Sequence, residues 1–287
     1  EVDSNITEAA QFTDPETMTF AQRIVFDSPA DLAAVDAAIG PVAASLAADY
    51  TLRPAAARRR ALIMVSKVEH CLLDLLFRLE REARAAGGAM VLLLGNHELM
   101  NAAGDLRYVT PGGLRDFDDV PGLDTAKWAE LPEPVRGRLA ALAPGGVYAR
   151  QLARNNVVAI VGDTVFSHAG VVGPWVGRVD EANWSSRCWL DGQAGGVESP
   201  PEVLIAQDGP VWTRAFGGDS VDCDGARATL AALGARRMAV GHTVQPTINA
   251  ACDGLVWRID VGMSAAYGGP LEILELAPEP RVIRVPR

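Results

Sequence analysis

Positive charge is scarce in this 287-residue chain, where 26 Lys and Arg stand against 36 Asp and Glu and give a formal net charge of −10. Binding along a nucleic-acid backbone needs a basic face, so the composition argues against a nucleic-acid partner. No apolar run approaches the roughly 20 residues of a membrane-spanning helix, which argues against a membrane partner. A phosphate compound remains compatible, because bound metal ions can supply positive charge locally.

Cysteine is also rare, and its four positions show no CxxC spacing: Cys71, Cys188, Cys223 and Cys252. This usage predicts reduced thiols in an intracellular protein, cytoplasmic or organellar. A basic-then-apolar leader is missing as well. The first residue is Glu1 rather than Met, which indicates a processed or incomplete product and leaves room for a lost targeting segment.

The remaining composition, 49% hydrophobic and 22% charged, is ordinary for a globular protein with room for one large α/β domain or two small ones. The clearest helix is expected over 72–86, where Leu and Phe recur at three-and-four spacing. Strands are expected at 23–27, 61–65, 90–94, 157–161, 164–166, 237–240, 255–261 and 271–276, with a hairpin turn at 162–163. Residues 1–22 are expected to be irregular, 30–60 to contain helix broken at Pro54, and 111–145 and 192–220 to be long surface loops.

Histidine is scarce too, yet three of the four histidines occupy the same kind of position. His97, His168 and His242 each follow a predicted strand and lie beside a glycine. Strand ends converge at one edge of a sheet, where α/β proteins build their sites. A single histidine near a turn is more often a plain hydrogen-bonded residue, but three repetitions of one context favour a shared site. Neutral imidazoles and the amide oxygen of Asn96 form a ligand set that suits zinc, manganese or iron.

Three motifs carry a family resemblance: GNHE at 95–98, SHAG at 167–170 and GHT at 241–243. In this order they resemble the last three signature motifs of the calcineurin-like metallophosphoesterases. The longer stretches that contain them, together with GPVWTR at 209–214, resemble the Shewanella-like protein phosphatases. This similarity covers roughly residues 72–287.

The resemblance implies an α/β fold of two packed mixed β-sheets flanked by helices, with residues 67–287 as the metallophosphoesterase domain and 1–66 as a divergent N-terminal segment. It implies hydrolysis of a phosphate ester by two divalent metal ions, with manganese, iron or zinc as the candidates. The substrate is expected to be a phosphorylated protein. A small molecule such as a dinucleoside polyphosphate is the alternative.

Residue roles follow from the same resemblance. Asn96, His168 and His242 would ligate one of the two ions. His97 would be the general acid that protonates the leaving oxygen, and Glu98 would support the ligands from behind.

Two arginines are candidates for phosphate binding, because their planar guanidinium groups match phosphate oxygens. Arg107 lies in GDLRY and Arg214 in PVWTR; a surface ion pair is the competing interpretation for each. Other residues near the motifs are expected to be structural. These are Trp212, Trp257, Asp260, Met263 and Tyr267.

The chain departs from the family pattern upstream of GNHE. The family's GDxHG and GDxxDRG motifs supply the first metal site, the bridging Asp and the Asp that orients the acid histidine. Neither motif occurs here, no Asp-x-His exists, and every Gly-Asp pair lies after GNHE. Three explanations remain open: an incomplete or misassembled chain, a pseudophosphatase that binds without turnover, or substitute ligands from Asp27 and Glu69-His70.

Overall fold

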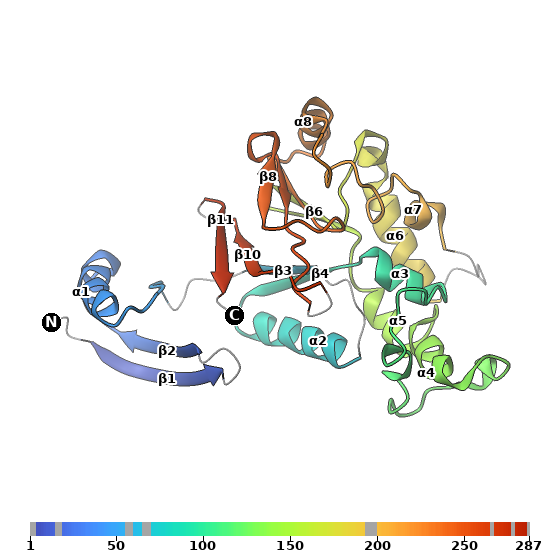
Figure 1. Ribbon diagram of the computed structural model, residues 1–287, viewed down its shortest axis with the longest axis horizontal. Helices are drawn as coiled ribbons and strands as arrows, with labels where there is room; N and C mark the ends of the chain where they lie inside the picture. Colours follow the sequence, from blue (N-terminus) through green and yellow to red (C-terminus); the bar gives the residue numbers. More distant parts are fainter. Residues whose placement is uncertain are drawn as a thin grey trace. The chain divides into compact units, whose positions relative to one another are not determined.

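A computed structural model of the chain describes residues 4–14, 19–54, 60–64, 70–192, 200–264, 267–276 and 279–285 (Figure 1). The chain forms two compact units, Glu1–Arg59 and Arg60–Val285. Within the described residues, no helix combines the length and the apolar character that a membrane span requires.

The N-terminal unit is a hairpin followed by a helix. Strand β1 (Asn5–Asp14) pairs antiparallel with β2 (Thr19–Asp27). The expectation that residues 1–22 are irregular is therefore wrong for 5–14 and 19–22, because pairing of the two strands satisfies a backbone whose side chains are mainly polar or small. Helix α1 (Leu32–Ser45) begins where Asp31 accepts a hydrogen bond from the Ala34 amide at 2.8 Å. It ends well before Pro54, the position at which a break was expected.

The larger unit begins with a parallel strand pair connected by a helix. Strands β3 (Arg60–Met64) and β4 (Ala89–Leu93) pair in parallel, and α2 (His70–Ala85) lies alongside them in Figure 1. A parallel pair needs such a crossover connection. The three predictions for this region are confirmed to within two residues at each end.

A five-stranded mixed sheet forms the centre of the same unit. Its order is β5-β6-β7-β9-β8. The strands are β5 (Val158–Val161), β6 (Thr164–Ser167), β7 (Arg237–Val240), β8 (Asn249–Ala251) and β9 (Val256–Arg258). The three inner strands are parallel, and both edge strands are antiparallel to their neighbours. The predicted hairpin at 162–163 and the predicted α/β class are confirmed.

Helices flank this sheet, and a further hairpin follows it. The helices are α3 (Asn96–Ala102), α4 (Glu133–Leu142), α5 (Val147–Leu152), α6 (Val179–Leu190), α7 (Glu202–Ile205) and α8 (Cys223–Ala232), and the hairpin is β10 (Leu271–Glu275) with β11 (Arg281–Val285). Short 3-10 turns lie at Gly113–Arg115, Ala126–Trp128, Gly173–Arg178 and Cys252–Gly254. The expected loop at 111–145 thus contains α4, which begins directly after Pro132, and the expected loop at 192–220 contains α7.

One disulfide corrects the expectation of four reduced thiols. Cys223 at the start of α8 and Cys252 after β8 are bonded, with their Cα atoms 5.3 Å apart. Their separation of 29 residues carries no signature in the sequence, because the fold alone brings the two positions together. Cys188 is free, as expected.

Candidate active site

Two of the three motif histidines leave adjacent strands of the central sheet. In the parallel pair β6–β7, Ser167 lies opposite Val240. His168 follows directly after β6 and His242 two residues after β7, so both imidazoles reach the same sheet edge. The Nε2 atom of His168 lies 3.0 Å from the Nδ1 atom of His242. The prediction that these strand ends converge is confirmed.

Tight backbone packing holds this pair in place. Gly170 has a φ of 120°, and a Cβ atom there would lie 2.3 Å from the Phe216 ring. A Cβ at Gly217 would lie equally close to the Thr243 side chain. His242 itself has a φ of 64°, a left-handed conformation that is uncommon for a residue with a side chain. Such strain persists where the surrounding structure enforces it, and it clusters at functional sites.

Asn96 approaches the pair from the end of β4. It is the first residue of α3, and it is buried. The preceding Gly95 lies against His168, since a Cβ there would be 3.0 Å from the Nδ1 atom. The Oδ1 atom of Asn96 is buried and has no hydrogen-bond partner. An unsatisfied buried acceptor is costly unless something absent from the protein's own atoms completes it.

His97 lies at the same cluster with an aromatic neighbour. Its ring centroid is 5.4 Å from that of Tyr108, at a tilt of 47°. Tyr108 is 59% exposed, so this ring contact borders solvent. The charge of His97 also acts on both His168 and His242, which places all three imidazoles within electrostatic range. Sequence reasoning missed Tyr108, although it directly follows the candidate Arg107.

Burial keeps the two inner histidines uncharged at neutral pH. It lowers the pKa of His168 to about 3, and repulsion from Arg214 and from the protonated forms of His242 and His97 acts in the same direction. The pKa of His242 falls to about 4, again through burial first and then through Arg214 and His97. Neutral imidazoles with free lone pairs are the form that binds metal ions.

Glu98 lies directly behind the cluster. Its Oε2 atom accepts a hydrogen bond from the Gly95 amide at 2.7 Å, which fixes the turn that presents Asn96 and His97. Burial raises the pKa of this carboxyl group to about 7, and the Gly95 hydrogen bond opposes that shift. The support of the metal ligands expected from Glu98 stays a prediction.

The two candidate arginines differ. Arg214 is at the cluster: its Nη1 atom donates to the Thr243 hydroxyl at 3.3 Å, and its charge acts on both inner histidines. Arg107 instead forms an ion pair with Asp105 at 2.7 Å. Arg214 is thus positioned to meet an anion beside His242, whereas Arg107 has to leave its partner to do so.

The side chains at the cluster offer an amide oxygen and imidazole nitrogens. Asn96 offers an orphaned amide oxygen, and His168 and His242 direct ring nitrogens at each other. These atoms form the N/O set that zinc, manganese or iron accepts. Within the described ranges, however, no group of three or more His, Cys, Asp or Glu residues is arranged to hold a metal. The described carboxylate nearest to these residues is Glu98, which lies beside Gly95 as His168 does.

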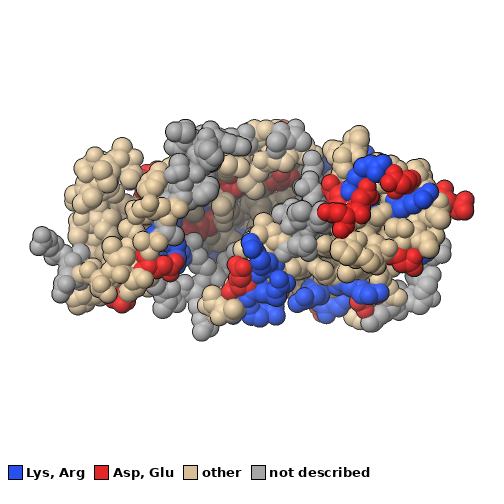
Figure 2. All heavy atoms as spheres, turned by 90° about the horizontal axis from the view of Figure 1, so that it is seen from below, with Lys and Arg blue, Asp and Glu red and all other residues tan. Residues whose placement is uncertain are grey.

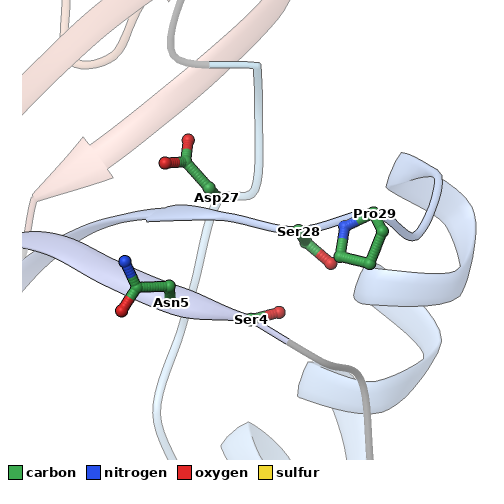
Figure 3. A pocket seen from close by; sticks show the side chains of 5 residues that line it. All are labelled: Ser4, Asn5, Asp27, Ser28 and Pro29. Carbon is green, nitrogen blue, oxygen red and sulfur yellow. The ribbon is translucent and has the colours of Figure 1, made fainter.

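The proposed substitute ligands belong to the N-terminal unit or fall outside the described residues. Asp27 ends β2 in the N-terminal unit, where it lines a hollow of about 410 Å³ with Ser4, Asn5, Ser28 and Pro29 (Figure 3). That hollow contains no histidine. Glu69 and the side chain of His70 fall outside the described residues.

The residues that were expected to be structural differ in their surroundings. Asp260 supports the backbone, since its carboxylate accepts from the Gly262 amide at 3.0 Å. Trp212 is half-buried, and its ring centroid lies 6.1 Å from that of His242 in an edge-to-face arrangement, so it contacts the site as well as the core. Met263 and Tyr267 are 49% and 65% exposed, which a purely supporting role does not explain.

Comparison with known proteins gives relatives of one phosphatase group. The chain is 35% identical over 240 residues to Shewanella-like protein phosphatase 2 of Arabidopsis thaliana, which covers 71% of this chain and 61% of that protein. The chain thus spans about three fifths of that relative. A solved structure of a mutant cold-active protein tyrosine phosphatase superposes with a TM-score of 0.56 at 25% identity, covering 74% of this chain and 61% of the other. No family model matches the chain.

A second similarity points to a different protein. The chain is 39% identical over 123 residues to formyltetrahydrofolate deformylase of Mycobacterium tuberculosis, which covers 41% of this chain and 37% of that enzyme. Because the phosphatase and deformylase alignments cover 71% and 41% of the chain, they share at least about a tenth of it.

Proposed function

Because this chain is a relative of the Shewanella-like protein phosphatases, we propose that it derives from a metal-dependent phosphomonoester hydrolase that acts on phosphorylated proteins. The observation that carries the proposal is the 3.0 Å approach of the His168 and His242 ring nitrogens. Beside them lies the turn in which the Oδ1 atom of Asn96 is buried without a hydrogen-bond partner. A bound metal ion supplies Lewis-acid chemistry and lowers the pKa of bound water.

The protein's own residues have separate tasks in this proposal. Asn96, His168 and His242 hold the ion. Arg214, beside Thr243, contacts phosphate oxygens through its guanidinium fork. His97 donates a proton to the leaving oxygen, and Tyr108 packs against the His97 ring.

The substrate is a phosphoprotein in the leading version of the proposal. Support comes from the names of the relatives, which are protein phosphatases, and of the structural neighbours, which are tyrosine phosphatases. The exposed Tyr108 next to His97 favours an aryl leaving group over an alkyl one, because two aromatic rings pack favourably.

The second candidate function is that of a pseudophosphatase, which binds a phosphorylated partner without hydrolysing it. It is favoured by the finding that no group of three or more His, Cys, Asp or Glu residues in the described ranges is arranged to hold a metal ion.

Manganese-dependent hydrolysis of p-nitrophenyl phosphate tests the proposal, with metal binding by calorimetry as an independent readout. For an enzyme, we expect His97→Asn to lower kcat by about 10²–10⁴-fold while metal affinity stays unchanged. His168→Asn should weaken metal binding itself. Metal binding without turnover above the His97→Asn variant would identify a pseudophosphatase. Absence of both would contradict the metal site.

A further inference from the structure

A second hollow lies between two helices of the larger unit, away from the histidine cluster residues. It encloses about 630 Å³ between α5 with the turn after it and α6. The lining residues are Arg150, Ala153, Arg154, Trp184, Arg187, Cys188 and Asp191. A hollow of this size falls within the range of small-molecule sites.

Helical spacing explains why these side chains share one hollow. On α6, Trp184, Arg187 and Cys188 follow an i, i+3, i+4 pattern, so they lie on one face. Arg150 and Arg154 are four residues apart across the end of α5 and likewise face the same side. The two helices pack against each other and close the hollow from both sides.

The unusual feature of this hollow is that three of its arginines form no ion pair in the described part of the chain. No ion pair with a carboxylate is formed by Arg150, Arg154 or Arg187 within the described part of the chain. Arg187 only donates to the Asn156 side chain at 3.4 Å. Like charges one helical turn apart are unfavourable, and this chain has 36 acidic residues from which a partner was available. Figure 2 shows that Lys and Arg gather in patches on the face it displays, despite the net negative charge.

An exposed tryptophan adds an aromatic surface to this positive hollow. The Trp184 residue is 67% exposed, while Trp175 and Trp189 in the same region are buried. A large exposed indole is a good stacking surface for a flat ring, and guanidinium groups bind phosphate in a fork geometry. Asp191 can accept a hydrogen bond from a hydroxyl or amino group. We propose that this hollow binds a small molecule that joins an aromatic ring to a phosphate, with a purine mononucleotide as the simplest case.

Calorimetry with AMP on the full chain in EDTA tests the site independently of any phosphatase activity. We expect AMP to bind at least about tenfold more tightly than inorganic phosphate or adenosine, because only AMP uses both the indole and the arginines. Trp184→Ala should weaken AMP about tenfold and leave inorganic phosphate unchanged. The double variant Arg150→Gln/Arg154→Gln should weaken both ligands. Arg81→Gln, an exposed arginine on α2, is the matched control and should change neither.

Protection of Cys188 from alkylation by AMP, followed by peptide mass spectrometry, gives a second readout that needs no substitution. We expect AMP to slow modification of Cys188 at concentrations near its dissociation constant. Undetectable AMP binding, unchanged binding in Trp184→Ala, no protection of Cys188, or loss of binding in His168→Asn alone would each overturn the proposal. The last result would place AMP at the histidine cluster.

Discussion

At the scale of single residues, Glu272 shows how one buried carboxylate fastens the end of the chain. It accepts a hydrogen bond from the Ile248 amide at 2.6 Å and from the Thr247 hydroxyl at 2.8 Å, while Arg284 donates at 2.8 Å. The Ile248 bond is the main cause that lowers the pKa of Glu272; burial opposes it, and the Thr247 and Arg284 bonds add to it. Because Arg284 is 71% exposed, its ion pair with Glu272 contributes little to the free energy of unfolding.

Acid should remove this contribution. A lowered folded pKa means that the stabilisation is present above the unfolded pKa and is lost as the pH falls through the folded pKa. We expect Glu272→Gln to lower the free energy of unfolding by about 1–3 kcal/mol at pH 7, since hydrogen bonds to a charged group are replaced. Urea titrations at pH 7 and pH 4 check this, and the difference between variant and parent should shrink at the lower pH. An undiminished difference would contradict the assignment.

Gly170 is a residue whose lack of a side chain positions the site. At its φ of 120°, an added Cβ would meet the Phe216 ring at 2.3 Å. Gly170→Ala should therefore cost about 2–4 kcal/mol through strain and overpacking. Gly173→Ala, where nothing lies within 4 Å of the added atom, is the matched control and should be nearly neutral. Thermal unfolding of both variants measures the difference, and equal costs would show that the Phe216 contact is irrelevant.

At the scale of elements, the disulfide closes a segment that contains β7 and the GHT motif. The bond joins Cys223 to Cys252, so His242 lies inside the closed loop. Chain-entropy arguments give about 3–4 kcal/mol for a loop of 29 residues. Cys223→Ser should lower stability by that amount under oxidising conditions, while Cys188→Ser should not. Urea unfolding with and without reductant provides the test, and insensitivity of the parent to reductant would contradict it.

Elements carried by local pattern could be predicted, and those that depend on distant partners could not. The apolar run before GNHE and the leucine-rich helix preceding it have the length and spacing that their structures need. Strand β1 is mainly polar and small, and it is stabilised by its pairing with β2. Helix α4 is hidden by the Pro- and Gly-rich context in which it begins. Both lack the local hydrophobic signal on which sequence reasoning depends.

The candidate site likewise has a part that local sequence patterns predict and a part that they do not. Three histidines at strand ends predict a cluster, because sheet geometry brings strand ends together. Tyr108 beside His97 and the edge of Trp212 beside His242 are set by loop conformation, which the sequence does not encode in any short motif. The disulfide is invisible for the same reason.

At the scale of the whole molecule, every residue of the histidine cluster belongs to the larger unit, and Asp27 belongs to the N-terminal unit. Deletion of residues 1–59 should therefore leave manganese affinity unchanged, because no ligand of the cluster is removed. Calorimetry measures the affinity, with circular dichroism to verify that the shortened chain is folded. If the deletion and Asp27→Asn both weaken metal binding by tenfold or more, Asp27 is a substitute ligand after all.

The backbone bridge between Leu93 and Asn156 joins β4 to the segment that enters β5. The Leu94 amide donates to the Asn156 carbonyl at 2.9 Å, two residues before Asn96. A hydrogen held in this way exchanges with deuterium only when the two segments part. The Asn156 side chain also accepts a hydrogen bond from Arg187, which lines the hollow between α5 and α6. The exchange rate of the Leu94 amide is therefore expected to respond to opening between β4 and the segment before β5, and to changes at Arg187.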